Sequence, residues 1–207
     1  LPASVAGATG SLPASVDTPK EALLVAQFLN RLLTLHQRLA GLQQMAFTDH
    51  LSGAFNRRYL MFFLDRLIAR AQREGFRITL AMFDIDDLKK YNDTYGHAVG
   101  DAVLKEVAQS MQSSLRSYDL LGRVGGEEFL IASPGSTLDD AAGLAERVRV
   151  TIKGREVMNM ADPITVTVSA GITSLSEQDA TTEALLARAD NALYLAKQQG
   201  RDRVVSL

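Results

Sequence analysis

The stretch RVGGEEFLI, residues 123–131, places two glycines directly before two glutamates and then returns to apolar residues. Strand candidates at 118–124 and 127–133 flank the glycines, and glycine readily adopts the positive φ of a two-residue hairpin turn. The pattern therefore predicts a β-hairpin. Most such turns are only turns, but Glu127 and Glu128 place like charges side by side, which indicates a cation nearby.

A second acidic cluster follows the apolar run ITLAMFDI (78–85), which has the length and composition of a strand buried on both faces. Here FDIDD (83–87) carries three carboxylates within four residues, and their mutual repulsion favours a bound cation. Asp84 and Glu127 on adjacent strands would supply the oxygen ligands that suit Mg²⁺, with Mn²⁺ as a possible substitute. The two clusters predict one shared metal site.

A phosphate site is predicted beside this metal. The chain must turn into a helix after Asp87, so free backbone N–H groups at the helix start could receive a phosphate, with Lys89 and Lys90 adding positive charge. A metal next to a phosphate indicates nucleotide chemistry. The sequence contains neither a phosphate-loop lysine motif nor a dinucleotide fingerprint, which argues against a standard NTPase or a Rossmann dehydrogenase.

The composition excludes several classes of protein. With 207 residues, 46% hydrophobic and 22% charged, the chain reads as one soluble globular domain plus an appendage. The absence of Cys excludes disulfides, thiolate zinc sites and cysteine nucleophiles, and suits the cytoplasm. A net charge of −2 makes nucleic acid an unexpected partner. No apolar run approaches the roughly 20 residues of a membrane-spanning helix.

The N-terminal part is predicted to be an appendage. Residues 1–17 contain LPASV twice among small residues and read as a flexible linker. Residues 18–46 begin with a capping box and read as a helix with a heptad seam formed by Val25, Phe28, Leu32, Leu35, Leu39, Leu42 and Ala46. An amphipathic helix packed on its own domain is the alternative, but we favour a parallel two-stranded coiled coil. Because the chain starts at Leu1 without Met, we expect a segment of a longer protein, which could be membrane-anchored upstream.

From residue 47 to 207 helical and extended patterns alternate, which predicts one folded domain. The helices are expected at 56–73, 99–116, 138–153 and 182–199, and the strands at 78–85, 118–124, 127–133, 164–173 and 203–206. Strands interleaved with helices, plus one hairpin, predict an α/β (α+β) sandwich in which helices cover a mixed, largely antiparallel sheet.

Five motifs between Thr48 and Val205 resemble the GGDEF family of diguanylate cyclases, in its GGEEF variant. They are TDHLSGAFNRR (48–58), DIDDLKKYNDTYGHAVGD (84–101), RSYDLLGRVGGEEF (116–129), VTVSAGI (166–172) and ADNALYLAKQQGRDRV (189–204), in the family's order and spacing. The resemblance implies a fold like that of nucleotidyl cyclases and polymerase palm domains. It also implies condensation of two GTP into cyclic di-GMP with release of two pyrophosphates.

The resemblance also implies a metal centre. Asp84, the main-chain carbonyl of Ile85 and Glu127 would hold Mg²⁺. Glu128 would assist at the metal, and Glu127 would also be the candidate base for the ribose 3′-hydroxyl. Lys89 would help to neutralise the phosphates.

Further residues are assigned to substrate by the same resemblance. Asn92 and Asp101 would read guanine, an amide and a carboxylate able to pair with the donors and acceptors of the base. His97 would line the same pocket. Lys197 and Arg201 would neutralise the phosphates.

A separate inhibitory site is implied by RSYD at 116–119, where the family carries its RxxD product-inhibition site. Arg116 and Asp119 would bind cyclic di-GMP, and Arg147 matches a secondary arginine for the same ligand. The alternative for Arg116 and Asp119 is a surface ion pair, worth about 0–1 kcal/mol.

Each domain would hold one GTP, so two domains must face each other across a two-fold axis. The coiled coil would join them as a homodimer and let an upstream sensor domain set their alignment.

Two other functions stay open at this point. One is a catalytically silent receptor or scaffold for GTP or cyclic di-GMP, against which the intact GGEEF argues. The other is a one-substrate cyclase that makes cGMP or cAMP, and Asn92 with Asp101 argues against adenine. The sequence departs from the family pattern at Ser52, Ala54, Leu88 and Asp202, and none of these removes a predicted ligand.

Overall fold

The computed structural model describes residues 31, 47–158, 163–176, 179 and 181–207. The predicted linker at 1–17 and the predicted coiled coil at 18–46 lie outside these residues, apart from Arg31. Contacts divide the chain into two units, and the second, Met45–Leu207, holds every element described below. Within the described ranges no helix has the length and apolarity that a membrane crossing requires.

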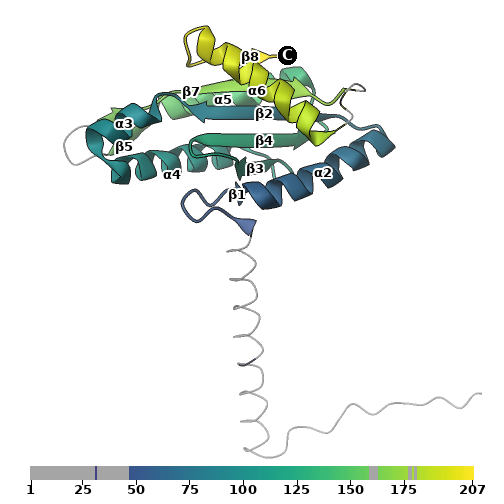
Figure 1. Ribbon diagram of the computed structural model, residues 1–207, viewed down its shortest axis with the longest axis horizontal. Coiled ribbons are helices and arrows are strands. Elements are labelled where there is room, and N and C mark those ends of the chain that lie inside the picture. Colours follow the sequence, from purple (N-terminus) through teal and green to yellow (C-terminus); the bar gives the residue numbers. More distant parts are fainter. Residues whose placement is uncertain (1–30, 32–46, 159–162, 177–178, 180) are drawn as a thin grey trace, which may run out of the picture. The chain divides into compact units, whose positions relative to one another are not determined.

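A mixed six-stranded sheet forms the centre of the domain, in the order β1-β3-β4-β2-β7-β8 (Figure 1). The four inner strands pair antiparallel, whereas the two edge strands, β1 and β8, pair parallel with their neighbours. The predicted mixed, largely antiparallel sheet is therefore confirmed. The strands are β1 Phe55–Asn56, β2 Ile78–Ile85, β3 Leu120–Arg123, β4 Glu128–Pro134, β7 Val168–Ser174 and β8 Val204–Ser206.

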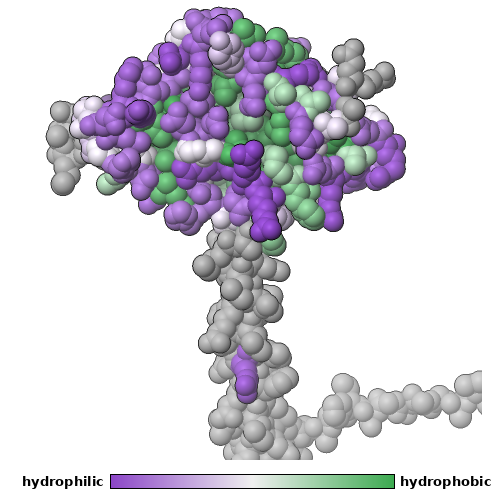
Figure 2. Space-filling view, viewed as in Figure 1, coloured by the Kyte–Doolittle hydropathy of each residue, from purple (hydrophilic) through white to green (hydrophobic). Residues whose placement is uncertain are grey.

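Five helices in the described part of the chain cover the sheet on both faces (Figure 1). Apolar residues of α2 and α6 pack with Leu80 and Leu130 on one face, and those of α4 and α5 pack with Phe83 and Phe129 on the other. Alternation along β2 and β4 thus fills two separate cores. The helices are α2 Arg57–Glu74, α3 Leu88–Tyr95, α4 His97–Ser114, α5 Leu138–Lys153 and α6 Thr182–Gln198. On the surface shown in Figure 2, hydrophilic residues surround the remaining apolar ones.

Local capping explains where the helices begin and end. The side chain of Asn56 accepts a hydrogen bond from the Tyr59 backbone N–H (2.9 Å) at the start of α2, and Gly75 ends that helix in the left-handed conformation. Thr137 and Asp140 form a reciprocal capping box at the start of α5. These signals lie within a few residues of each helix end, which is why the sequence predicted the helices well.

Helix α6 approaches the sheet closely at Gly171 of β7. A Cβ added there would lie 2.0 Å from the Leu193 nitrogen and 2.4 Å from the Ala189 oxygen. Only a residue without a side chain permits this contact between helix backbone and strand. The contact matters for the site because α6 carries Lys197.

The predicted single strand at 164–173 is wrong in its extent. It divides into β6 Pro163–Thr165, which pairs with β5 Glu156–Met158 in a separate two-stranded sheet, and β7. Between them the Thr167 carbonyl accepts a hydrogen bond from the Asp86 N–H (2.9 Å), beyond the end of β2. Period-two alternation continues through this break, so the pattern alone gave no sign of it.

Candidate active site

Asp84 lies at the centre of the site, near the carboxyl end of β2. The sheet register sets it between Glu128 of β4 and Ser169 of β7. Its side chain is only 5% exposed, and its Oδ2 lies 2.7 Å from Nζ of Lys197, which α6 supplies. Three strands and one helix therefore fix the position of this carboxylate.

The negative charges around Asp84 exceed the positive charge that Lys197 provides. Burial raises its pKa to about 6; the hydrogen bond and charge of Lys197 oppose the rise, whereas the charges of Glu127 and Glu128 add to it. Three carboxylates thus share one ammonium group, a set that suits a divalent cation. Among the described residues no group of three or more acidic or His side chains is arranged to hold a metal ion by itself. Mg²⁺ commonly takes only one or two carboxylates from a protein and completes its shell with waters and substrate phosphates.

The loop between β3 and β4 presents the two glutamates. The hairpin is confirmed, but the predicted two-residue turn is wrong: the connection spans 124–127, and neither glycine belongs to those with φ in the left-handed region. A Cβ at Gly125 would lie 2.2 Å from Oε2 of Glu128, so a larger residue there would displace that carboxylate. The Glu127 carbonyl accepts a hydrogen bond from the Ile85 N–H (3.2 Å), which ties the loop to the end of β2.

Arg123 and Asp49 support this loop from behind, and the sequence did not predict the pair. One guanidinium nitrogen of Arg123 lies 3.0 Å from Oδ1 of Asp49, and the other donates to the Gly126 carbonyl (2.5 Å). Burial alone would raise the pKa of Asp49, but hydrogen bonds from Ser52 and the charge of Arg123 hold it below its ordinary value. The segment before α2 is thereby linked to the GGEEF loop.

Asp86 has a structural role, although it belongs to the same acidic cluster. It is buried and accepts hydrogen bonds from the hydroxyls of Thr167 and Ser169, each at 2.7 Å, and from the backbone N–H of Asp202 at 3.1 Å. Three donors satisfy this carboxylate without a metal. Asp86 therefore joins the end of β2 to β7 and to the turn after α6.

Asp87 begins α3 in the left-handed conformation (φ 56°) and makes no side-chain cap. Its carboxylate lies 3.0 Å from Nζ of Lys90 and 3.8 Å from Nε of Arg201. Lys90 is therefore paired with Asp87, while Lys89 lies exposed on the same helix. Arg201 is brought to the predicted phosphate turn from the far end of the chain.

The residues predicted to read guanine lie on α3 and α4, which meet at Gly96. Asn92 is partly buried, whereas His97 and Asp101 are exposed on the first turns of α4. A Cβ at Gly100 would lie 1.8 Å from the Asn92 side-chain oxygen, so glycine makes room for that amide directly beside Asp101. The structure thus brings the predicted amide and carboxylate into one neighbourhood.

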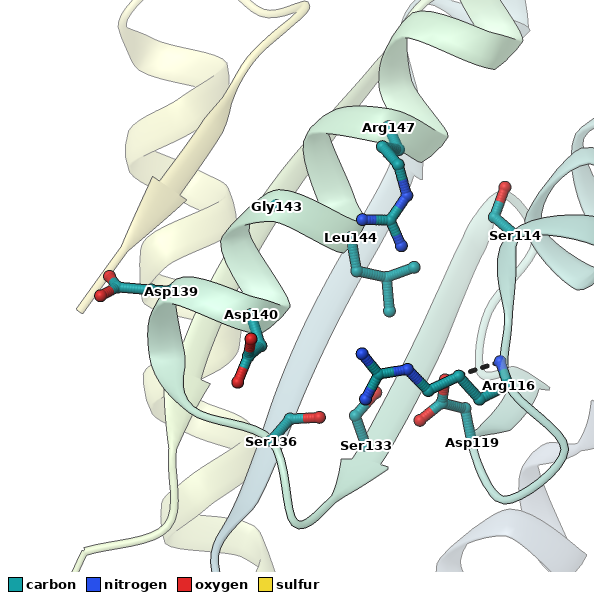
Figure 3. A pocket seen from close by; sticks show the side chains of 10 residues that line it. All are labelled: Ser114, Arg116, Asp119, Ser133, Ser136, Asp139, Asp140, Gly143, Leu144 and Arg147. Atoms are coloured by element: carbon teal, nitrogen blue, oxygen red, sulfur yellow. Dashed lines mark hydrogen bonds between the residues drawn. The ribbon is translucent and has the colours of Figure 1, made fainter.

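The predicted inhibitory residues line a separate cavity of about 200 Å³ between β4 and α5. Figure 3 shows the guanidinium groups of Arg116 and Arg147 directed into this pocket on either side of Leu144. Asp119 and Ser133 line it as well, and Asp119 Oδ1 and Ser133 Oγ are buried without a hydrogen-bond partner. Two cations and unsatisfied polar atoms in one pocket suit a polar, anionic ligand.

The ion-pair alternative for Arg116 and Asp119 does not match the structure. The Asp119 carboxylate accepts a hydrogen bond from the Arg116 backbone N–H (2.9 Å), and the guanidinium of Arg116 donates to the Tyr118 hydroxyl (3.1 Å). Within the described part of the chain Arg116 forms no salt bridge, so its charge is available to a ligand.

A mixed sheet with an acidic centre near the end of its middle strand, and with the cations Lys197 and Arg201 beside it, is the arrangement of a nucleotide-processing α/β domain. The family model described as "Diguanylate cyclase, GGDEF domain" matches residues 46–203, and the chain belongs to this family.

The sequence is similar to those of other proteins of this kind. The response regulator PleD of Caulobacter vibrioides is 43% identical over 164 residues, covering 78% of this chain and 36% of PleD. The diguanylate cyclase DgcP of Pseudomonas aeruginosa is 41% identical over 169 residues, covering 82% of this chain and 25% of DgcP. The chain thus spans between a quarter and about a third of these relatives.

Solved structures share the fold. The coiled coil and GGDEF domain of DgcB from Caulobacter crescentus, in complex with c-di-GMP, matches with a TM-score of 0.81 at 31% identity, covering 92% of this chain and 100% of that one. The diguanylate cyclase SiaD from Pseudomonas aeruginosa, in complex with its activator SiaC, matches with a TM-score of 0.77 at 40% identity. The match covers 91% of this chain and 72% of that one.

Proposed function

We propose that this chain condenses two GTP molecules into cyclic di-GMP and releases two pyrophosphates. The observation that carries the proposal is the centre at Asp84, where Glu127, Glu128 and Lys197 surround one buried carboxylate. Family membership supports the same activity. An Mg²⁺-dependent phosphoryl-transfer site requires carboxylates whose negative charge is not neutralised by the protein, next to cations that can bind the phosphates.

Mg²⁺ would be held by Asp84, the main-chain carbonyl of Ile85 and Glu127, with Glu128 assisting, and Mn²⁺ could replace it. The residues fit, because this part of the site carries three carboxylates and a single paired ammonium group. When bound, the ion would stabilise negative charge on the reacting phosphates.

The protein's own groups would carry the remaining steps. Glu127 takes the proton of the 3′-hydroxyl of one GTP, whose oxygen forms the new bond to the α-phosphorus of the other GTP while the bond to pyrophosphate breaks. Lys89, Lys197 and Arg201 stabilise the charge that gathers on the leaving pyrophosphate.

Recognition of the base would orient the substrate. Asn92 and Asp101 hydrogen-bond to guanine, and His97 lines the same pocket. The support is that Gly100 leaves room for the Asn92 amide next to Asp101. Holding the nucleotide in one orientation accelerates the reaction by lowering its entropic barrier.

Dimerisation and feedback complete the proposal. Two domains face each other across a two-fold axis, joined by a coiled coil at 18–46 under the control of an upstream sensor domain. Cyclic di-GMP then binds at Arg116, Asp119 and Arg147 and inhibits the enzyme. The support is the two guanidinium groups that line that pocket and the c-di-GMP complex of the related DgcB domain.

Product analysis tests the activity. The protein is incubated with Mg²⁺ and GTP, and the nucleotides are separated by chromatography. We expect cyclic di-GMP from the wild type and at least a 100-fold slower reaction from Glu127→Gln, since a positioned base contributes about 10²–10⁴-fold. Glu183→Gln, exposed in the first turn of α6, is the matched control. Equal product from Glu127→Gln would remove that residue from the mechanism, and GTP binding without any product would favour a silent receptor.

A second assay tests feedback. Arg116→Ala should raise the cyclic di-GMP concentration at which the reaction stalls, because the pocket loses one of its two guanidinium groups. Arg73→Ala, 71% exposed on α2, is the control and should leave the inhibition curve of the wild type unchanged. An unchanged curve for Arg116→Ala would reject this inhibitory site.

A further inference from the structure

The turn after α6 holds two consecutive residues in an unfavourable backbone conformation. Arg201 has φ 61° and Asp202 has φ 46°, and both carry a Cβ that disfavours the left-handed region. Arg201 is the residue that reaches the phosphate turn at Asp87. Its side chain can stay there only if neighbouring contacts hold this backbone in place.

The side chain of Asp202 forms salt bridges with two cations of α5. Arg149 Nη1 lies 2.5 Å from Oδ1, and Lys153 Nζ lies 2.5 Å from Oδ2. The Arg149 side chain is only 15% exposed and is itself oriented by Glu146 at 2.6 Å. We name Arg149, Lys153 and Asp202 the ionic clasp.

The backbone of Asp202 is held from the opposite direction. Its N–H donates to Oδ2 of Asp86 (3.1 Å), and Asp86 is fixed in turn by Thr167 and Ser169. The next residue continues the anchoring, since the Arg203 carbonyl accepts a hydrogen bond from the Ala170 N–H (2.9 Å). Asp202 is therefore fixed at both its side chain and its main chain, directly beside Arg201.

We propose that the ionic clasp positions Arg201 for the triphosphate, so that Arg149, Lys153 and Asp202 act in substrate binding without touching substrate. The inference rests on the proposed function, in which Arg201 binds phosphate. The clasp fixes the strained backbone at Arg201 and Asp202. Among the described residues, the Arg201 side chain has one ionic contact, at 3.8 Å from Asp87. A merely structural ion pair would stabilise the fold and leave nucleotide affinity unchanged.

Nucleotide binding tests the clasp apart from turnover. Calorimetry with Mg²⁺ and an α,β-methylene GTP analogue measures the affinity of the wild type and its variants. We expect Arg201→Ala to weaken binding about tenfold, as loss of a charged hydrogen bond does. Asp202→Asn, which keeps the shape and removes the charge, should weaken it about 3- to 10-fold. Arg155→Ala, which breaks the ion pair of Arg155 with Glu106 beyond the end of α5, is the control and should bind as the wild type.

A double-mutant cycle and hydrogen exchange decide the mechanism. In the Arg201→Ala background Asp202→Asn should cause no further loss of affinity, because the clasp acts through Arg201. Asp202→Asn, but not Arg155→Ala, should speed amide exchange at residues 200–203. Wild-type affinity of Asp202→Asn, or an equal loss with and without Arg201, would overturn the inference while the proposed function stands. Wild-type affinity of Arg201→Ala would overturn both its phosphate role and the inference. Cyclic di-GMP formation, measured separately, tests the proposed activity.

Discussion

Replacing Asp84 with Asn should make the metal-free protein more stable while it abolishes activity. The pKa of Asp84 is about 6 in the folded protein against an ordinary 3.8, and this value already includes the attraction of Lys197. The folded state therefore binds the proton more tightly than the unfolded state. Stability falls as pH rises from about 4 to above 6, by up to about 3 kcal/mol for this difference. The Asp84→Asn variant carries a neutral amide at this position, so its stability does not fall in this way as the pH rises.

The assay is urea unfolding followed by circular dichroism, with EDTA, at pH 4.5 and pH 7.5. At pH 7.5 Asp84→Asn should be about 2–3 kcal/mol more stable than the wild type, and at pH 4.5 the difference should shrink to about 1 kcal/mol. Asp86→Asn is the control at the same strand end. It should lose about 1–3 kcal/mol, because Asp86 accepts three hydrogen bonds and the amide group would face those donors. An Asp84→Asn difference that is equal at both pH values, or destabilising at pH 7.5, would refute this reasoning.

Three further substitutions follow from close contacts. Gly171→Ala should lose about 3 kcal/mol or more in thermal unfolding, since its Cβ would meet α6 backbone at 2.0 Å, whereas Gly143→Ala, with open space around it, should not destabilise. Gly100→Ala should raise KM for GTP about tenfold by displacing the Asn92 amide, 1.8 Å from the new Cβ; an unchanged KM would contradict the guanine assignment. Asp49→Asn should lower stability by about 1 kcal/mol and slow product formation, because Arg123 loses its ionic partner behind the GGEEF loop; wild-type turnover would separate that pair from the site.

The sequence predicted most of the fold because its signals are local. The predicted strand at 78–85 and helix at 138–153 match β2 and α5 in both bounds. A continuous apolar run bounded by polar residues fixes the first, and the capping box at Thr137 and Asp140 fixes the start of the second. The acidic clusters predicted Asp84 and Glu127 as metal ligands, whereas the guanine-reading and inhibitory residues came from resemblance to a known family.

What the sequence missed depends on contacts between distant residues. The Asp49 turn could have been found locally, since Ser52 hydrogen-bonds back to Asp49, but its partner Arg123 lies 74 residues further on. The division of the strand at 164–173 likewise depends on Asp86, which hydrogen-bonds to Thr167 between β6 and β7. Neither contact leaves a periodic pattern in the sequence.

The three carboxylates of FDIDD have three different environments. Mutual repulsion predicted one cluster that requires one cation, but the fold places each carboxylate among different partners. Hydrogen bonds satisfy Asp86, and Asp87 is more exposed and lies beside Lys90 and Arg201. Only Asp84 is both buried and left with too little positive charge. Because a cation that binds the folded state alone stabilises it, the stability that Asp84 removes at neutral pH should return when Mg²⁺ and GTP bind.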